Sequence, residues 1–264
     1  MGEASSDHWH PGAAYLYVLH LDAPALAWEY LRRHPDFRRD WLHRRRDPDA
    51  AQRWGLRFLE DPGMNARDAH PAWFPDHDAV VQLYPDADPP PNALPFEFWR
   101  IPGERQLIHD GRRLILMARL PGCCVRLALA PALEDGMAYV HAIRACHMPC
   151  PRYRAMAGEL EKLQATHDTT SAVTKPRPSA SSMLELHTLQ ALDGTLAGAS
   201  LRTVADVLFG AEAVVAGWHA DGDLRARVRR LMRRGLNLMR GGYRRLAQLP
   251  PVEQGRSATG AQRP

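Results

Sequence analysis

This 264-residue sequence is almost without lysine, because arginine supplies all but two of its 34 basic residues. It contains no uninterrupted run of about 18 apolar residues, so we expect neither a membrane span nor a membrane partner. The opening segment MGEASSDHWH has no basic start and no apolar centre, and it does not resemble a signal peptide. These absences predict a protein that stays in the cytoplasm.

Catalytic signatures are also missing. The sequence has no GxSxG motif, no phosphate-binding Walker loop, no dinucleotide-binding glycine pattern and no HExxH spacing. Its pairs of aspartate and glutamate lie in turns, where exposure to solvent explains them. Because no nucleophile, general base or cofactor site can be named, we expect a protein that is not an enzyme and carries no cofactor.

Cysteine is scarce, and the four cysteines are poorly spaced for a metal. Cys146 and Cys150 flank His147, and Cys123 with Cys124 supplies enough further ligands for a zinc tetrahedron. Adjacent cysteines and a three-residue gap depart from the paired CxxC spacing of structural zinc sites. We therefore expect free thiols and no metal site, with zinc as the alternative.

The sequence does have a concentrated basic segment near its C-terminal end. Residues 223–245 contain nine arginines and one acid, a net charge of +8 in a chain of net +4, which leaves −4 for the rest. A basic element on an otherwise mildly acidic protein is typical of a partner with a phosphate backbone.

The spacing within this segment predicts an amphipathic helix. At 100° per residue an apolar sector of about 120°, centred near Gly235, contains Leu224, Val228, Leu231, Met232, Leu238 and Met239. The opposite face carries Arg229, Arg230, Arg233, Asn237 and Arg240. Arg225, Arg227 and Arg234 flank the seam.

The outer face has the chemistry of a DNA reader. Arginine and asparagine make bidentate contacts to the edges of guanine and adenine. The alternatives are a solvated basic face or a helix that lies on a membrane surface. Part of the arginine enrichment is also explained by a compositional bias of the genome, given how little lysine there is.

Residues before the basic segment indicate a helix-turn-helix variant. Ser200 is a suitable N-cap for a helix over 201–209, and Gly210 supplies its stop. A short apolar helix over 211–218 follows, and a leucine-rich helix from 183 to 192, punctuated by Asp193-Gly194, precedes the pair. The basic helix comes one helix later than in the usual motif, so the register of the recognition helix stays open.

The segments SLRTVADVLFGAEAVVAGW and LRARVRRLMRRGLNLMRGGYRRL resemble the C-terminal DNA-binding domain of regulators of proteobacterial integrative and conjugative elements. The run WEYLRRHPDFRRDW resembles the small transcriptional-regulator-like domain that precedes it in this family. The resemblance, to FseA-like excision activators, implies an activator of excision and transfer genes. Related proteins with only the C-terminal domain act as antiactivators through protein contacts, so the resemblance alone leaves DNA binding undecided.

The remaining sequence predicts a small helical domain over 22–84, whose four tryptophans at 28, 41, 54 and 73 close a core. Asp22 caps its first helix. A Pro-rich linker over 85–104 precedes three or four antiparallel strands from about 105 to 143 and a helix from 152 to 164. We divide the chain into units 22–84, 85–104, 105–166, a flexible linker 167–182, the DNA-binding domain 183–246 and a disordered tail 250–264.

The sequence thus predicts an α+β protein that binds double-stranded DNA as an activator of mobile-element genes. The residues expected at DNA are Arg202, Thr203, Arg225, Arg229, Arg230, Arg233, Arg234, Asn237, Arg240, Arg244 and Arg245. The rival functions are a protein-interaction module that docks on a related regulator and a plasmid partition or replication control protein. The oligomeric state stays open, with a homodimer among the options.

Overall fold

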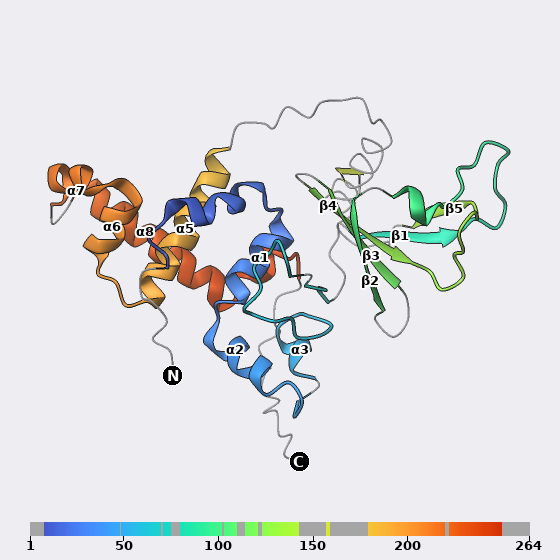
Figure 1. Cartoon of the computed structure of the whole chain (residues 1–264), viewed down its shortest axis with the longest axis horizontal. Helices are drawn as coiled ribbons and strands as arrows, with labels where there is room; N and C mark the ends of the chain where they lie inside the picture. The colour runs from blue at the N-terminus through green and yellow to red at the C-terminus, as the bar shows by residue number, and fades with distance from the viewer. Residues whose placement is uncertain are drawn as a thin grey trace, which may run out of the picture.

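The computed structural model describes residues 8–47, 49–69, 71–74, 80–101, 103–109, 114–120, 123–142, 157–158, 179–219 and 222–249. The fold is α+β, as predicted. Helices gather on one side of the molecule and a five-stranded sheet lies on the other (Figure 1).

The helical part combines both ends of the described chain. From the N-terminal side it contains the 3-10 helix η1 (Gly12–His20), α1 (Ala23–Leu31), α2 (Pro35–Leu42) and α3 (Ala50–Arg53). From the C-terminal side it contains α5 (Ala180–Leu196), α6 (Leu201–Phe209), α7 (Ala211–Gly217), α8 (Asp223–Asn237), the π-helical turn η3 (Leu238–Gly242) and α9 (Tyr243–Leu246).

Three of these helices begin after a residue whose side chain caps the first turn. The Asp22 carboxylate accepts a hydrogen bond of 2.9 Å from the backbone N–H of Ala25, which confirms the predicted cap of α1. Ser200 caps α6 through the N–H of Thr203 at 3.1 Å, also as predicted. Ser179 caps α5 in the same way. Each cap satisfies one of the N–H groups that a helix start leaves unpaired.

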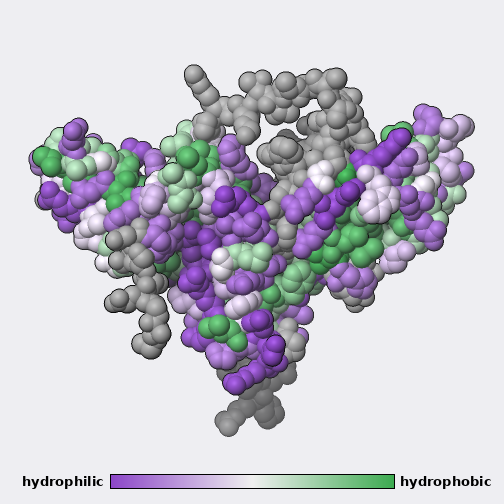
Figure 2. Space-filling model, viewed as in Figure 1, coloured by the Kyte–Doolittle hydropathy of each residue, from purple (hydrophilic) through white to green (hydrophobic). Residues whose placement is uncertain are grey.

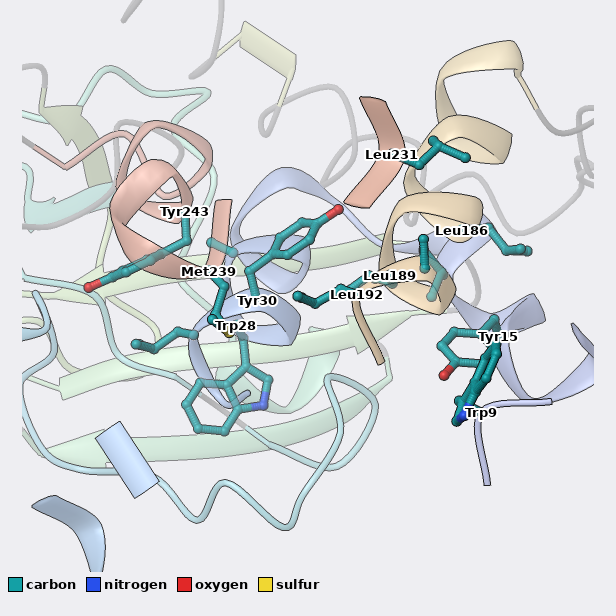
Figure 3. Close-up of a cluster of buried hydrophobic side chains, with 14 of the residues drawn as sticks. Trp9, Tyr15, Trp28, Tyr30, Leu186, Leu189, Leu192, Leu231, Met239 and Tyr243 are labelled. Atoms are coloured by element: carbon teal, nitrogen blue, oxygen red, sulfur yellow. The ribbon is translucent and has the colours of Figure 1, made fainter. Parts of the chain in front are cut away.

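One hydrophobic core joins the N-terminal and C-terminal helices. Trp28 and Tyr30 of α1, Leu189 and Leu192 of α5 and Met239 of η3 belong to one buried cluster, in which Tyr30 lies near Leu192 and Trp28 near Met239 (Figure 3). The sequence-based expectation of a self-contained core within 22–84 therefore differs from the observed packing. Tryptophans of the N-terminal region complete a core that the C-terminal helices share.

The four tryptophans expected in that core do not behave alike. Trp28 and Trp73 are buried in the shared cluster, and Trp54 is packed against it. Trp41 is only half-buried, with the Arg44 guanidinium 3.9 Å from its ring centroid. A fifth tryptophan, Trp9, takes a fully buried position that the sequence analysis did not assign.

A chain of buried ion pairs also crosses the shared core. Arg33, which follows α1, donates through Nε and Nη2 to the Asp193 carboxylate of α5, at 2.6 and 2.8 Å, and through Nη1 to Glu29 at 2.5 Å. The Tyr15 hydroxyl donates to Asp193 at 2.6 Å, and Arg32 donates to Glu29 at 2.7 Å. Buried charges persist only when paired and hydrogen-bonded, and here three segments of the chain supply the partners.

The sequence analysis expected Asp193-Gly194 to interrupt the leucine-rich helix, but α5 continues through both residues to Leu196. Asp193 forms an ion pair with Arg33, and this pairing stabilises it within the helix. Gly194 gives space to the Trp9 ring, since a Cβ there would lie 2.9 Å from Trp9 Cζ3. The Asp-Gly pair serves packing between helices and does not form a turn.

The sheet has the strand order β2-β3-β4-β1-β5. Its strands are β1 (Val80–Pro85), β2 (Glu104–His109), β3 (Leu114–Leu120), β4 (Cys123–Leu129) and β5 (Tyr139–Ala142). The predicted hairpin is confirmed, because β2 and β3 pair antiparallel in the register Leu107 with Leu116. The predicted antiparallel strands from about 105 onward are confirmed for β2, β3 and β4. The sequence did not predict β1, which precedes the Pro-rich segment and pairs parallel with β4.

The sheet has its own apolar layer and one charged link to the helices. Val81, Leu116 and Leu127 are buried on one face, where Phe96 covers them. The Arg126 guanidinium of β4 reaches the α1 cap Asp22 at 2.9 Å. Figure 2 shows a hydrophobic patch over the sheet, whereas hydrophilic side chains cover most of the visible surface of the helical part.

Some predictions fall on residues outside the described ranges. They concern most of the helix expected over 152–164, the linker over 167–178 and the tail after 250. The turn residues 110–113 of the hairpin also lie outside them. Within the described residues, no helix combines the length and hydrophobicity that crossing a bilayer requires.

Candidate nucleic-acid interface

The predicted amphipathic helix is present as α8, and it packs its apolar side on α5 (Figure 1). Val228 and Leu231 are buried, and Leu224 and Met232 are packed against the same cluster. The predicted apolar sector is therefore confirmed. Burial of this sector fixes which side of the helix can face a partner.

Gly235 allows this close packing. A Cβ atom at this position would lie 2.9 Å from the Cβ of Leu192 and 3.2 Å from the backbone oxygen of Thr188, both on α5. A side chain here would push the two helices apart. The glycine near the centre of the predicted apolar sector thus sets the distance from which the arginines of α8 project.

The outer face of α8 is exposed. Four of the five predicted side chains, Arg229, Arg230, Arg233 and Asn237, lie on it, and the fifth, Arg240, is exposed in η3 directly after it. Within the described part of the chain, no carboxylate lies within ion-pair distance of these four arginines. Their charges therefore add up on one surface, which favours an anionic partner.

Arg234, the immediate neighbour of Arg233, has a different environment. Its Nη2 donates to the Glu185 carboxylate of α5, which also accepts a hydrogen bond of 2.6 Å from the Tyr30 hydroxyl. Burial and the nearby Glu185 carboxylate raise the pKa of Tyr30, so the phenol stays a hydrogen-bond donor. Arg234 was predicted to contact DNA, but its guanidinium links three helices of the fold.

A second aromatic and basic cluster lies on the same flank of α8. The Arg227 guanidinium lies 4.8 Å from the ring centroid of Phe209 at the end of α6. The Phe209 ring is 5.8 Å from that of His187 on α5. Burial and the positive charge of Arg227 lower the pKa of His187, which keeps this imidazole neutral at pH 7. Arg227 was expected beside the seam of the helix, without a role in binding. The seven-residue spacing between Arg227 and Arg234 places both on one flank of the helix, and this was the feature of the sequence from which a shared site could have been predicted.

The basic segment bends after α8. The chain forms the π-helical turn η3, in which Gly241 has φ 142° and ψ −19°, and α9 then begins at Tyr243. Such a backbone conformation is readily open only to glycine. Arg240 precedes the bend, so Arg244 and Arg245 do not continue the outer face of α8 as a straight helix would.

The two arginines of α9 also differ from one another. Arg245 is exposed, whereas Arg244 is half-buried and its Nη1 lies 3.5 Å from the backbone oxygen of Arg53 beside α3. The positive charge of Arg240 acts on His34 at the start of α2, where burial and this charge together hold the pKa of the imidazole below its usual value. The end of the basic segment therefore contacts the N-terminal helices.

The remaining predicted residues lie on α6 and on the second flank of α8. Arg202 and Thr203 are exposed in the first turn of α6, where the Thr203 hydroxyl lies 2.8 Å from the hydroxyl of the cap Ser200. Arg225 is half-buried. The structure thus exposes eight of the predicted residues and partly buries Arg225, Arg234 and Arg244.

The zinc alternative is not tested by the described residues. Cys146, His147 and Cys150 lie outside them, and of Cys123 and Cys124 only the backbone in β4 is described. Among the described residues, no group of three or more His, Cys, Asp or Glu is arranged to hold a metal ion.

Comparison with protein families gives three consecutive matches. Residues 8–59 match the proteobacterial transcriptional regulator-like domain. Residues 78–125 match a domain of unknown function, DUF7011. Residues 126–248 match the T6SS transcription factor DNA-binding domain of the RovC type. No curated protein matched the chain.

The matches divide the molecule differently from its packing. The boundary between residues 125 and 126 falls within β4, and the first and third matched segments share one hydrophobic core. The DNA-binding match contains α5 to α9 and therefore the whole outer face of α8. The matched families support a DNA-binding transcriptional regulator, and the exposed arginines Arg229, Arg230 and Arg233 of α8 lie within the DNA-binding match.

Proposed function

We propose that this protein binds duplex DNA by laying the outer face of α8 in the major groove. The observation that carries the proposal is the exposed row of Arg229, Arg233 and Asn237, beside which Arg230 and Arg240 also project. These side chains are free of carboxylate partners within the described residues. They are also the types that read base edges.

The dimensions of α8 suit this role. A 15-residue helix is about 22 Å long, and the major groove is about 12 Å wide, so one helix fits with its side chains against the bases. Arg229, Arg233 and Asn237 are four residues apart and follow one face for about two turns. We assign base contacts to this row.

The flanking residues are assigned to phosphates. Arg202 and Thr203 lie at the N-terminus of α6, where free N–H groups and the helix dipole favour an anion. Arg245 is exposed beyond the bend, and Arg225 lies half-buried on the far flank of α8. Such contacts position a protein on the duplex without reading sequence.

For the biological role we infer a non-enzymatic transcriptional activator in the cytoplasm, whose targets are the excision and transfer genes of a mobile element. The sequence resemblance to excision activators supports this target. The RovC-type match names a T6SS transcription factor, so secretion genes are the competing target. Mapping the sequence selected by the protein onto its own genome separates these two targets.

The DNA-binding proposal is tested with the full chain and a duplex selected by it from a random pool. The double variant Arg229→Ala/Arg233→Ala removes two charges from the outer face. Arg45→Ala/Arg46→Ala removes the same charge from two exposed arginines after α2, and it serves as the matched control. We expect the first variant to lose at least tenfold in affinity and the control to change by less than about twofold.

The salt dependence of binding supplies a second readout. The slope of log affinity against log salt falls by about 0.9 for each phosphate contact that is lost. A large loss of affinity with little change in slope would assign Arg229 and Arg233 to bases. A wild-type chain that selects no duplex and binds none at low ionic strength would overturn the proposed function.

A further inference from the structure

A groove lies between the first half of α5 and one flank of α8. Its volume is about 570 Å³, within the range of roughly 300–1,000 Å³ that small-molecule sites occupy. Met183 and Leu184 form one wall, and Leu231 of α8 lies opposite. The groove shares Arg230 with the outer face of α8, whereas the base-reading row Arg229, Arg233 and Asn237 does not line it.

The walls of the groove are apolar and open to solvent. Met183 is 38% exposed and Leu184 is 42% exposed, although Leu186, Leu189 and Leu192 of the same helix are buried. Leu231 is buried at the base. Two exposed apolar side chains in a recess gain free energy when an apolar group covers them.

The rim of the groove is strongly basic. Arg227, Arg230 and Arg234 line it from α8, and the described lining residues include no acid. Arg234 is paired with Glu185 of α5, so the positive charge offered to a ligand comes mainly from Arg227 and Arg230. The Nε of Arg234 is buried and has no hydrogen-bond partner among the described residues. The positive end of the α5 dipole adds to this field, because the groove begins at Ala180 in the first turn. Burial, and then the charge of Arg227, lower the pKa of His187 at the edge of the groove.

The length of the groove favours a small molecule over a docked helix. Its walls run from Ala180 to His187 and from Arg227 to Arg234. Seven residues of helix span about 10 Å, which is two turns. A molecule of about a dozen non-hydrogen atoms fills this length, whereas a partner helix of ordinary length would extend well beyond both walls.

We propose that this groove binds an amphipathic carboxylate, a compact apolar body with one acid group. The carboxylate pairs with Arg227 and Arg230, which offer the planar fork that matches it. The apolar body covers Met183, Leu184 and Leu231. Arg227 is already held over the Phe209 ring, so little side-chain freedom is lost when it binds.

The site has a consequence for DNA binding that rests on the proposed function. Arg230 lines the groove and also projects at the edge of the outer face of α8. A carboxylate that pairs with Arg230 removes its charge from the surface offered to DNA. The ligand and the duplex therefore compete, and each lowers the apparent affinity of the other by the same factor.

The test uses two probes, decanoate and 1-anilinonaphthalene-8-sulfonate, an aromatic anion whose fluorescence rises in apolar sites. Decanol, which has the same chain without the charge, is the ligand control. We expect the dye to bind the full chain with one-site saturation. Decanoate should displace it about tenfold more effectively than decanol, because one charge-assisted pair contributes at least about that factor.

Variants locate the site. Arg227→Gln should abolish the preference for decanoate over decanol, and Leu184→Glu should abolish binding of both anions. Arg229→Gln on the outer face and Leu42→Glu, an exposed leucine at the end of α2, are the matched controls and should bind as the wild type does. Far-UV circular dichroism and the melting temperature establish that each variant is folded.

Equal displacement by decanoate and decanol, or dye binding that Leu184→Glu leaves unchanged in a folded variant, would overturn the ligand site. A wild-type chain that binds the dye at this site but no duplex would retain the site and overturn the proposed function. If both bind, decanoate at saturation should weaken duplex binding several-fold in the wild type. That effect should be lost in Arg227→Gln.

Discussion

The arginines that follow α1 and those of α8 are chemically the same but have opposite surroundings. Arg32 and Arg33 come directly after α1 and lie against the buried carboxylates Glu29 and Asp193. The outer arginines of α8 are exposed, and the described residues place no carboxylate beside them. Arg32 and Arg33 stabilise the packing of helices within the fold, whereas the outer arginines of α8 are available to bind a partner.

The number of arginines in a segment therefore does not show where a binding surface lies. The role of each arginine depends on whether a carboxylate from another helix lies within ion-pair distance. Arg234 makes the point within α8 itself, since Glu185 of α5 pairs with it while its neighbour Arg233 faces solvent. The predictions below alter one side of this comparison at a time.

Acid should disrupt the buried ion pairs of Arg32 and Arg33 completely. Burial raises the pKa of Glu29 and of Asp193, but the charges and hydrogen bonds of Arg33 and Arg32 outweigh it and leave both values below the ordinary 4.5 and 3.8. Carboxylates with a depressed pKa contribute stability that is present above the ordinary value and lost as pH falls through the folded value. We expect unfolding to begin below about pH 4.5.

The measurement is urea denaturation across pH 2.5 to 7. Stability that stayed flat below pH 4 would contradict the assignment of these carboxylates to the folded ion-pair network.

Asp193→Ala should be the most damaging single change. It leaves the buried Arg33 guanidinium and the Tyr15 hydroxyl without their shared acceptor. Removing one partner of a buried ion pair costs about 3–5 kcal/mol. Chemical denaturation followed by tryptophan fluorescence measures the loss. A cost below 1 kcal/mol would show that water replaces the carboxylate at no great penalty.

Gly235→Val should have a smaller effect on the packing of α8. The added side chain would meet Leu192 and the backbone of Thr188, and overpacking costs about 1–3 kcal/mol. Gly217→Val at the end of α7 is the matched control, because a Cβ there would make only ordinary contacts with Leu224. Equal melting temperatures for the two variants would contradict the close approach of α8 to α5.

The smallest effect is expected at an exposed pair on α2. Arg39 and Asp36 are bonded at 2.7 Å, but both side chains are more than half exposed. Solvent-exposed pairs contribute about 0–1 kcal/mol. Asp36→Ala should therefore change the unfolding free energy by less than about 1 kcal/mol. A larger loss would show that the burial of an ion pair does not predict its contribution to the unfolding free energy.

Local features of the fold were predictable from the sequence. The caps at Asp22 and Ser200, the hairpin of β2 with β3 and the buried side of α8 all depend on residues within a few positions of one another. Spacing therefore carries the information.

Features that depend on distant partners were not predictable. Nothing near Asp193 in the sequence reveals Arg33, which lies 160 residues away, and the Asp-Gly pair was expected to interrupt the helix. The parallel pairing of β1 with β4 and the core shared by the two ends of the chain were missed for the same reason. At the candidate site, the outer face was predictable from helical periodicity, but the partner of Arg234 and the groove beside Arg227 required the position of α5.

The most direct test compares Arg233→Ala with Arg234→Ala, two adjacent substitutions that remove the same charge. Both variants are measured for the unfolding free energy and for affinity to a duplex selected by the wild type. Arg233→Ala should lower affinity by about 1–3 kcal/mol and leave stability within about 0.5 kcal/mol. Arg234→Ala should lower stability by about 1–2 kcal/mol, because Glu185 loses its cation, and change affinity by less than about twofold while folded. If Arg234→Ala weakened DNA binding more than Arg233→Ala without loss of stability, the outer face of α8 would not be the DNA-binding surface.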